Sequence, residues 1–174
     1  MQIPKLLNGL GLQWTGLKEI EDYTQSDSDG FGCSNNYVLD RIILSNTRTT
    51  IKSYFAQGCV SLKEVINIEN ITSFGDYCFS DCVSFSPEIV FNGSLTLLGR
   101  NSFYRTSVKT VTFRNTDVLP TINTNSFLQC KYLTDIYCPW AEGEVANAPW
   151  GATNATIHFN TQYDENGNPI IEEV

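Results

Sequence analysis

A segment of 23 or 24 residues recurs along the chain, and this repeat constrains the fold more than any other feature of the sequence. Four stretches align: "SYFAQGCVSLKEVINI", "DYCFSDCVSFSPEIVF", "RNSFYRTSVKTVTF" and "TNSFLQCKYLTDIYC". Their first shared position holds Ala56, Phe79, Phe103 and Phe127, and the position three residues later holds Cys59, Cys82, Thr106 and Cys130. An apolar residue follows (Leu62, Phe85, Val108 and Leu133), and then the residue that begins a short strand (Val65, Ile89, Val111 and Ile136). Such self-similarity at a fixed period predicts a solenoid, in which each coil buries its apolar side against its neighbours.

The repeat predicts a β-rich solenoid with one short parallel strand in each coil of 22–25 residues. The phenylalanines are expected to stack in one buried column, and the cysteines in a second column. Leu39 and Ile42 extend the register upstream, whereas "LKEI" at 17–20 fits either a weak further copy or a short amphipathic helix. We therefore expect an N-terminal cap or partial repeat over 1–36, repeat coils over 37–138, a C-terminal cap over 139–163 and an exposed tail over 164–174.

The pattern "FxxCxxLxxI", preceded by a strand and a turn, resembles the BspA-type leucine-rich repeats, which are built from coils of about 23 residues. The resemblance covers about residues 37–160. Three departures predict locally irregular coils: Ala56 replaces a phenylalanine, Thr106 replaces a cysteine, and "SPEIVFNGSL" adds a residue before its strand. Repeats of this kind occur in bacterial surface adhesins, protist surface proteins and tailed-phage structural proteins, so the resemblance implies a fold more firmly than a function.

The stretch after the last aligned copy predicts a cap that closes the solenoid. "PWAEGEVANAPWGATNATIHFN" carries no further phenylalanine–cysteine pair, and its prolines stop the repeat from continuing. Trp140 and Trp150 are large enough to cover the end of the core, which water would otherwise reach. This segment also resembles a closing segment that follows such repeats in proteins of phage or prophage type.

Charge and composition exclude several classes of partner. The formal net charge is −8 and no run of lysine or arginine occurs, which argues against nucleic acid and against anionic membrane surfaces. No apolar stretch approaches the roughly 20 residues that span a bilayer, so we expect no membrane insertion. The start of the chain, "MQIPKLLNGLGLQW", lacks the pattern of a signal peptide, so the protein is either not exported by that route or cut from something longer.

The residues that most often carry chemistry favour a non-enzymatic protein. The six cysteines (Cys33, Cys59, Cys78, Cys82, Cys130 and Cys138) form no CxxC pair, and buried free thiols are favoured over a disulfide or a metal site. The run Asp27–Gly30 lacks the later ligands of a calcium loop. His158, the single histidine, is assigned to a strand of the cap, and Glu142 and Glu144 to a solvated loop. We therefore expect no catalytic residue, no metal and no cofactor.

The predicted strands offer one candidate binding face. Alternate side chains of a strand point to opposite sides, so the residues next to each buried strand position point outward. The outward column is Ile43, Ile66, Val90, Thr112 and Tyr137, and its flank is Arg41, Glu64, Glu88, Thr110 and Asp135. An apolar column with a largely acidic margin is typical of an interface, although β-branched residues also favour strands without any such role. The sequence predicts contact with a protein, a surface glycan or a second copy of the chain. Two settings remain open: a phage or prophage virion, and a bacterial cell surface.

Overall fold

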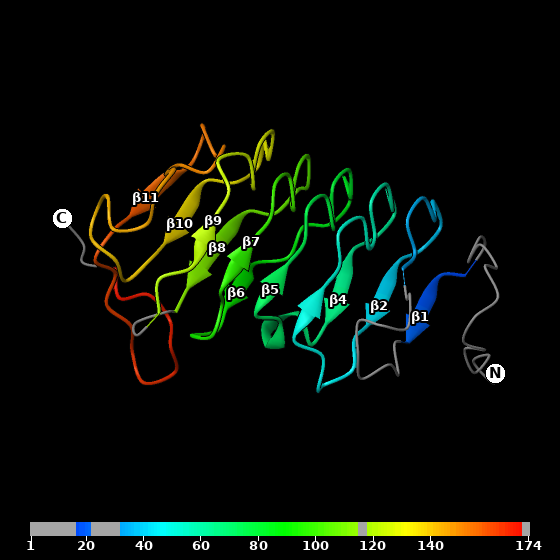
Figure 1. Cartoon of the computed structure of the whole chain (residues 1–174), viewed down its shortest axis with the longest axis horizontal. Coiled ribbons are helices and arrows are strands. Elements are labelled where there is room, and N and C mark those ends of the chain that lie inside the picture. The colour runs from blue at the N-terminus through cyan, green and yellow to red at the C-terminus, as the bar shows by residue number, and fades with distance from the viewer. Residues whose placement is uncertain (1–16, 22–31, 115–117, 172–174) are drawn as a thin grey trace.

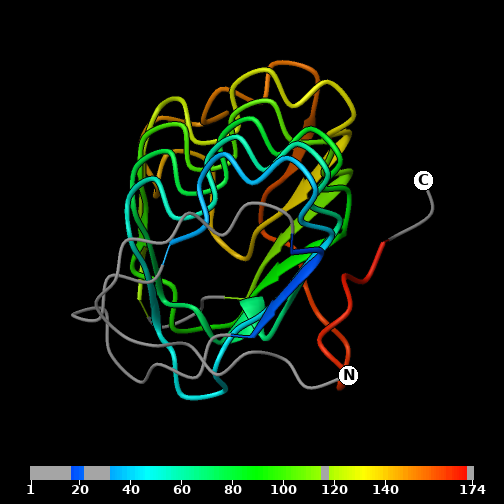
Figure 2. The same ribbon diagram turned by 90° about the vertical axis from the view of Figure 1, so that its right-hand side faces the viewer.

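The computed structural model describes residues 17–21, 32–114 and 118–171, and these form a parallel β-solenoid. The coils follow one another along the long axis (Figure 1), and they superpose around a common core when viewed down that axis (Figure 2). The predicted solenoid is therefore confirmed. Within these described residues no helix has the length and apolar character needed to cross a bilayer.

One side of the solenoid, here called the main face, carries a strand from each coil. Its strands are β1 (Glu19–Glu21), β2 (Arg41–Ile43), β4 (Glu64–Ile66), β6 (Ile89–Phe91), β8 (Thr110–Phe113), β10 (Asp135–Tyr137) and β11 (Thr156–His158). All pair in parallel, in the orders β1-β2-β4 and β6-β8-β10-β11. The expected irregularity is found between β4 and β6, which do not pair. The extra residue of "SPE" lies there, and Pro87 has no N–H to donate to a ladder.

A second sheet lies on another side of the solenoid and has strands from four coils, so the prediction of one strand per coil was incomplete. It contains β3 (Thr50–Ile51), β5 (Ser73–Phe74), β7 (Leu97–Leu98) and β9 (Thr121–Ile122), again paired in parallel. Strands of two residues are too short to show the alternation by which a strand is recognised in a sequence. The short 3₁₀ helix η2 (Ile68–Asn70) follows β4.

The phenylalanine column is present and buried, as predicted. Phe79, Phe103 and Phe127 are each 0% exposed. Their rings stack at centroid distances of 5.6 Å for Phe79–Phe103 and 5.7 Å for Phe103–Phe127. Backbone hydrogen bonds extend the same position toward the N-terminus, because Cys33 N donates to Phe55 O as Ala56 N donates to Cys78 O. The phenylalanine slot therefore holds Cys33, Ala56, Phe79, Phe103 and Phe127.

The cysteine slot satisfies backbone carbonyls inside the solenoid. The thiol of Cys59 donates to Cys33 O at 3.0 Å, that of Cys82 to Ala56 O at 3.1 Å and that of Cys130 to Phe103 O at 3.0 Å. Thr106 bonds within its own coil instead: its hydroxyl donates to Phe103 O at 2.9 Å and lies 3.3 Å from Cys130 Sγ. A small side chain with one donor thus explains why threonine can replace cysteine here.

All six cysteines are buried. Burial raises the pKa of the Cys138 thiol to about 12, and it also raises that of Cys78. Thiols with such pKa values are poor nucleophiles in the folded protein. That they are reduced remains a prediction: alkylation under denaturing, non-reducing conditions should modify all six, and four or fewer would reveal a disulfide.

The C-terminal end is closed by the two predicted tryptophans. Trp140 and Trp150 are 3% and 0% exposed, and both rings contact Phe113, at 5.1 Å and 5.8 Å between centroids. Trp150 Nε1 donates to Ala146 O at 2.8 Å, and the hydroxyl of Tyr163 donates to Phe113 O at 2.7 Å. These contacts cover the last coil with apolar and hydrogen-bonded groups. The domain boundaries given above stay a prediction, and the run Asp27–Gly30 lies outside the described residues.

Candidate binding face

The parallel register brings the predicted site residues into two rows on the main face. Ile42, Val65, Ile89, Val111 and Ile136 form the inner row, and each is buried. The first outer row, which precedes them, holds Glu19, Arg41, Glu64, Glu88, Thr110, Asp135 and Thr156. The second outer row, which follows them, holds Glu21, Ile43, Ile66, Val90, Thr112, Tyr137 and His158.

The apolar side chains of the second outer row are only partly exposed to solvent. Ile43, Ile66 and Val90 are half-buried, and Thr112 is only 6% exposed. Thr112 lies between Val90 of β6 and Tyr137 of β10 in the same row, so it has a side-chain neighbour on each side. The outward column is thus interrupted at β8, and its apolar part at the N-terminal side comprises Ile43, Ile66 and Val90.

Ion pairs between residues of the first outer row partly neutralise its charges. Arg41 Nε lies 2.7 Å from Glu64 Oε2, and Arg41 Nη1 lies 3.3 Å from Glu19 Oε2, so one guanidinium joins three neighbouring strands. The hydrogen bond and charge of Glu64 raise the pKa of Arg41 above its ordinary value, which keeps it cationic. Lys63 and Asp40 form a further pair at 3.3 Å beside this cluster. Glu88 remains exposed in the next strand position.

The C-terminal end of the face contains a pair of residues that the sequence analysis did not connect. His158 Nε2 lies 2.8 Å from Asp135 Oδ1, and the His158 ring stacks on Tyr137 with centroids 4.4 Å apart. The hydrogen bond from His158 lowers the pKa of Asp135 below its ordinary value. The spacing that aligns Ile157 with Ile136 also aligns His158 with Tyr137. The repeat register could therefore have predicted that these two rings are neighbours.

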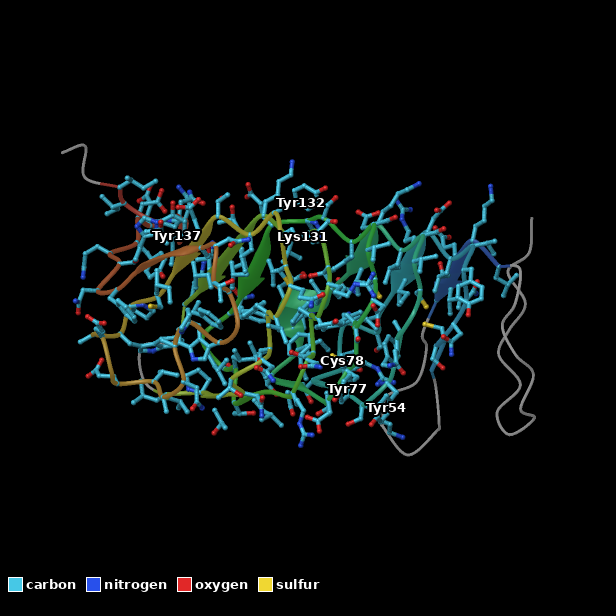
Figure 3. The ribbon with its side chains drawn as sticks, turned by 90° about the horizontal axis from the view of Figure 1, so that it is seen from above. Tyr54, Tyr77, Cys78, Lys131, Tyr132 and Tyr137 are labelled. Carbon is cyan, nitrogen blue, oxygen red and sulfur yellow. The ribbon has the colours of Figure 1, made fainter. Side chains whose placement is uncertain are left out.

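Exposed aromatic side chains in the turns are a further feature that the sequence analysis missed. Tyr37 and Tyr132 are each 61% exposed and Tyr54 is 53% exposed. Tyr54 stacks on Tyr77 with centroids 5.4 Å apart. Lys131 and Tyr132 lie on one long side of the solenoid with Tyr137, and Tyr54 and Tyr77 lie on the other (Figure 3).

The remaining candidate groups do not form a constellation typical of catalysis. Glu142 and Glu144 are exposed, and Glu144 Oε2 accepts a hydrogen bond from Ala141 N at 2.7 Å. In the described part of the chain, no three histidine, cysteine or acidic side chains lie together as a metal site requires. His158 pairs with Asp135 on the sheet, so its assignment to a strand is confirmed.

Comparison with known proteins agrees with this architecture. The model of the BspA-type leucine-rich repeat region matches residues 17–146 in six copies. The chain belongs to this family. No curated protein and no solved structure gave a match. The family supports a repeat module for protein binding or adhesion, and leucine-rich repeat solenoids are generally not catalysts. Six copies from residue 17 also favour the weak first copy at 17–20, where β1 continues the ladder.

Proposed function

We propose that this protein is a non-enzymatic binding module that engages another protein through the main face. One observation carries the proposal: the register pairs Ile43 with Ile66, Val90 occupies the equivalent position of β6 in the repeat, and a row rich in carboxylates lies beside them. Apolar side chains drive association when they are removed from water, and a charged margin sets the orientation of the partner.

The charges of the face favour a partner with basic residues. The first outer row holds Glu19, Glu64, Glu88 and Asp135 against the single cation Arg41. This excess of carboxylates means that the main face attracts a cationic surface and repels an acidic one. A second copy of the chain is a less favoured occupant of the main face, because it would bring the same excess of acid. A surface glycan is less favoured there because it has no basic groups to pair with the carboxylates.

The biological setting that we propose is a phage or prophage virion, in which the module attaches to another virion protein or to a surface. This rests on the resemblance of "PWAEGEVANAPWGATNATIHFN" to closing segments of phage-type repeat proteins. The alternative is an adhesin-type repeat domain on a bacterial cell surface that binds host or matrix protein. The genes beside this one discriminate the two: tail and baseplate genes favour the virion, and an export signal on the full-length gene favours the adhesin.

The face is tested by a double substitution, Ile66→Lys with Val90→Lys. Both side chains are half-buried on the outer side of the sheet, so the variant should fold while losing its partner. The matched control is Ser73→Lys with Leu97→Lys, which places two lysines on directly paired strands of the second sheet. Binding to virion particles, bacterial cells and matrix proteins, together with self-association by light scattering, is measured for all three proteins.

The expected result is loss of binding in the Ile66→Lys, Val90→Lys variant alone. Circular dichroism and thermal melting report whether each variant is folded. If a folded main-face variant binds as well as the unchanged protein, the interface lies elsewhere, and equal loss in the control would mean that added charge rather than position is responsible.

A further inference from the structure

One turn of the solenoid is shorter than the others, and this leaves a hollow in the ridge beside the main face. Two residues separate the cysteine slot from the next apolar position in three aligned coils, at Cys59–Leu62, Cys82–Phe85 and Cys130–Leu133. Only Ser107 separates Thr106 from Val108. A hollow of about 240 Å³ lies at this gap. Its lining includes Val83, Arg105, Ser107, Gln129, Lys131 and Tyr132.

The floor of the hollow is held by hydrogen bonds to the preceding coil. Ser107 N donates to Phe85 O at 2.9 Å, and its hydroxyl donates to Val83 O at 2.6 Å. Arg105 N donates to Leu128 O at 3.1 Å in the following coil. Because the backbone is fixed on both sides, the groups around the hollow are already arranged before a ligand arrives, which lowers the entropic cost of binding.

The hollow is cationic in a protein that is acidic. It is lined by Arg105 and Lys131 and by no carboxylate, while the whole chain carries a net charge of −8. Arg105 Nη1 is held by Asp81 Oδ1 at 2.7 Å, so the position of the guanidinium is fixed while it keeps further N–H donors. The exposed ammonium group of Lys131 has no ion pair within the described residues. These groups favour a ligand that carries a carboxylate.

The other walls suit a ring rather than a simple ion. Tyr132 is 61% exposed and Val83 is 40% exposed, so an aromatic face and an apolar side chain stand beside the cations. Gln129 Oε1 accepts a hydrogen bond from the Tyr104 hydroxyl at 3.1 Å, which leaves the amide NH₂ of Gln129 free to act as a donor. The volume of the hollow, about 240 Å³, is below the roughly 300–1,000 Å³ of sites for drug-sized ligands. The hollow therefore suits a ligand of one ring.

We propose that this hollow binds one carboxylate-bearing sugar residue of an acidic glycan. Lys131 and Arg105 bind the carboxylate, Gln129 donates to a ring hydroxyl, and Tyr132 packs against the apolar face of the ring. The carboxylate of an acidic peptide side chain would bind Lys131 and Arg105 but would leave the ring of Tyr132 without a contact. A sugar ring contacts both the cations and Tyr132, so it fits the hollow better. The site is separate from the apolar row of the main face, and the proposal does not depend on that face binding a protein.

The test compares two sugars that differ in the carboxylate. The full chain, labelled with ¹⁵N, is titrated with methyl β-glucuronide and with methyl β-glucoside, and the amide signals of residues around Ser107 and Lys131 are followed. Losing a hydrogen bond to a charged group costs enough to weaken binding about tenfold, so the glucoside is expected to bind about tenfold more weakly. Added salt should weaken binding of the glucuronide and leave the glucoside unchanged.

Three variants and one further probe make the proposal falsifiable. Lys131→Gln and Tyr132→Ala should each weaken glucuronide binding about tenfold. Insertion of one serine after Ser107 restores the two-residue turn and should abolish binding by filling the hollow. The control is Tyr37→Ala, which removes an equally exposed tyrosine from a turn that does not line the hollow. Spectra of the variants show directly whether they fold.

Several results would overturn the proposal. One is the absence of shifts with methyl β-glucuronide at tens of millimolar, and another is binding that survives Lys131→Gln and Tyr132→Ala in folded variants. Equal binding of the two sugars would remove the role of the carboxylate. A blocked Gly-Glu-Gly tripeptide that binds more tightly than the glucuronide at the same residues would make this a site for acidic peptides.

Discussion

The phenylalanine slot is filled in two different ways along the solenoid. In the C-terminal half it holds Phe79, Phe103 and Phe127, whose rings stack on one another. In the N-terminal half it holds Cys33 and Ala56, and Phe55, the residue before Ala56, is buried and meets Phe79 edge-on at 6.0 Å. The residue type at this slot therefore matters less for stability than the volume that side chains fill in the core. Protein interiors are packed to crystal-like density, and a neighbouring residue such as Phe55 can fill the space that a smaller slot residue leaves.

The largest expected effect comes from removing a ring in the regular half. Phe103→Ala should lower the free energy of unfolding by about 3–5 kcal/mol, since the ring is fully buried between two others of the column. Urea unfolding followed by circular dichroism measures the change. Tyr132→Ala, at an exposed turn, is the control and should change stability by less than about 0.5 kcal/mol. A loss below about 1 kcal/mol for Phe103→Ala would contradict the stacking that the column represents.

Removing the ring of the irregular half should cost less. Phe55→Ala is expected to lower the free energy of unfolding by about 3 kcal/mol, near the low end for buried phenylalanine, because the small neighbours Cys33 and Ala56 let the site contract. The same urea titration compares it with Phe103→Ala. If Phe55→Ala lowered the free energy of unfolding clearly more than Phe103→Ala, the packing of the N-terminal coils would depend mainly on this one ring.

The cysteine slot allows a finer distinction between volume and hydrogen bonding. Thr106→Val keeps the shape but removes the hydroxyl that donates to Phe103 O. Because this carbonyl still accepts from Thr106 N and Cys130 Sγ, the change should cost about 0.5–1.5 kcal/mol. Thr106→Cys restores the residue type found in the neighbouring coils and should change stability by less than about 1 kcal/mol. Chemical unfolding of both variants measures this difference. Equal stability of the two would show that the slot requires volume alone.

The sequence predicted those parts of the molecule that repeat. The period predicted the solenoid, the column of Phe79, Phe103 and Phe127, and the register of the main-face strands, because a regular stack forces equivalent residues into line. The tryptophan cap followed from the need to close the core. The second sheet could not be predicted, because its two-residue strands carry no periodicity of their own.

The candidate site was predicted only in part, for a physical reason. A period fixes which residues share a row, but the exposure of a side chain depends on the size of its neighbours in adjacent coils. Thr112 is buried between neighbours on two paired strands, and the pairing of Asp135 with His158 depends on side chains from two coils. The hollow at Ser107 lies at a turn that is one residue shorter than its counterparts, a difference visible only when the turn lengths of the repeats are compared.

The smallest expected effect concerns the main face, where contacts are polar and half-exposed, in contrast to the buried columns. The pKa of Asp135 is lowered in the folded protein, chiefly by the hydrogen bond from His158. A group with a depressed folded pKa stabilises the protein above its unfolded pKa, about 3.9 for aspartate, and that stabilisation is lost as the pH falls through the folded value.

Because the pair is partly exposed, Asp135→Asn should cost only about 0.2–1 kcal/mol at neutral pH. Thermal melting of both proteins from neutral pH down to about pH 3 should show the difference shrinking as Asp135 becomes protonated. A difference that stays constant over this range would mean that the asparagine disturbs packing against Tyr137 and His158 rather than removing a charge.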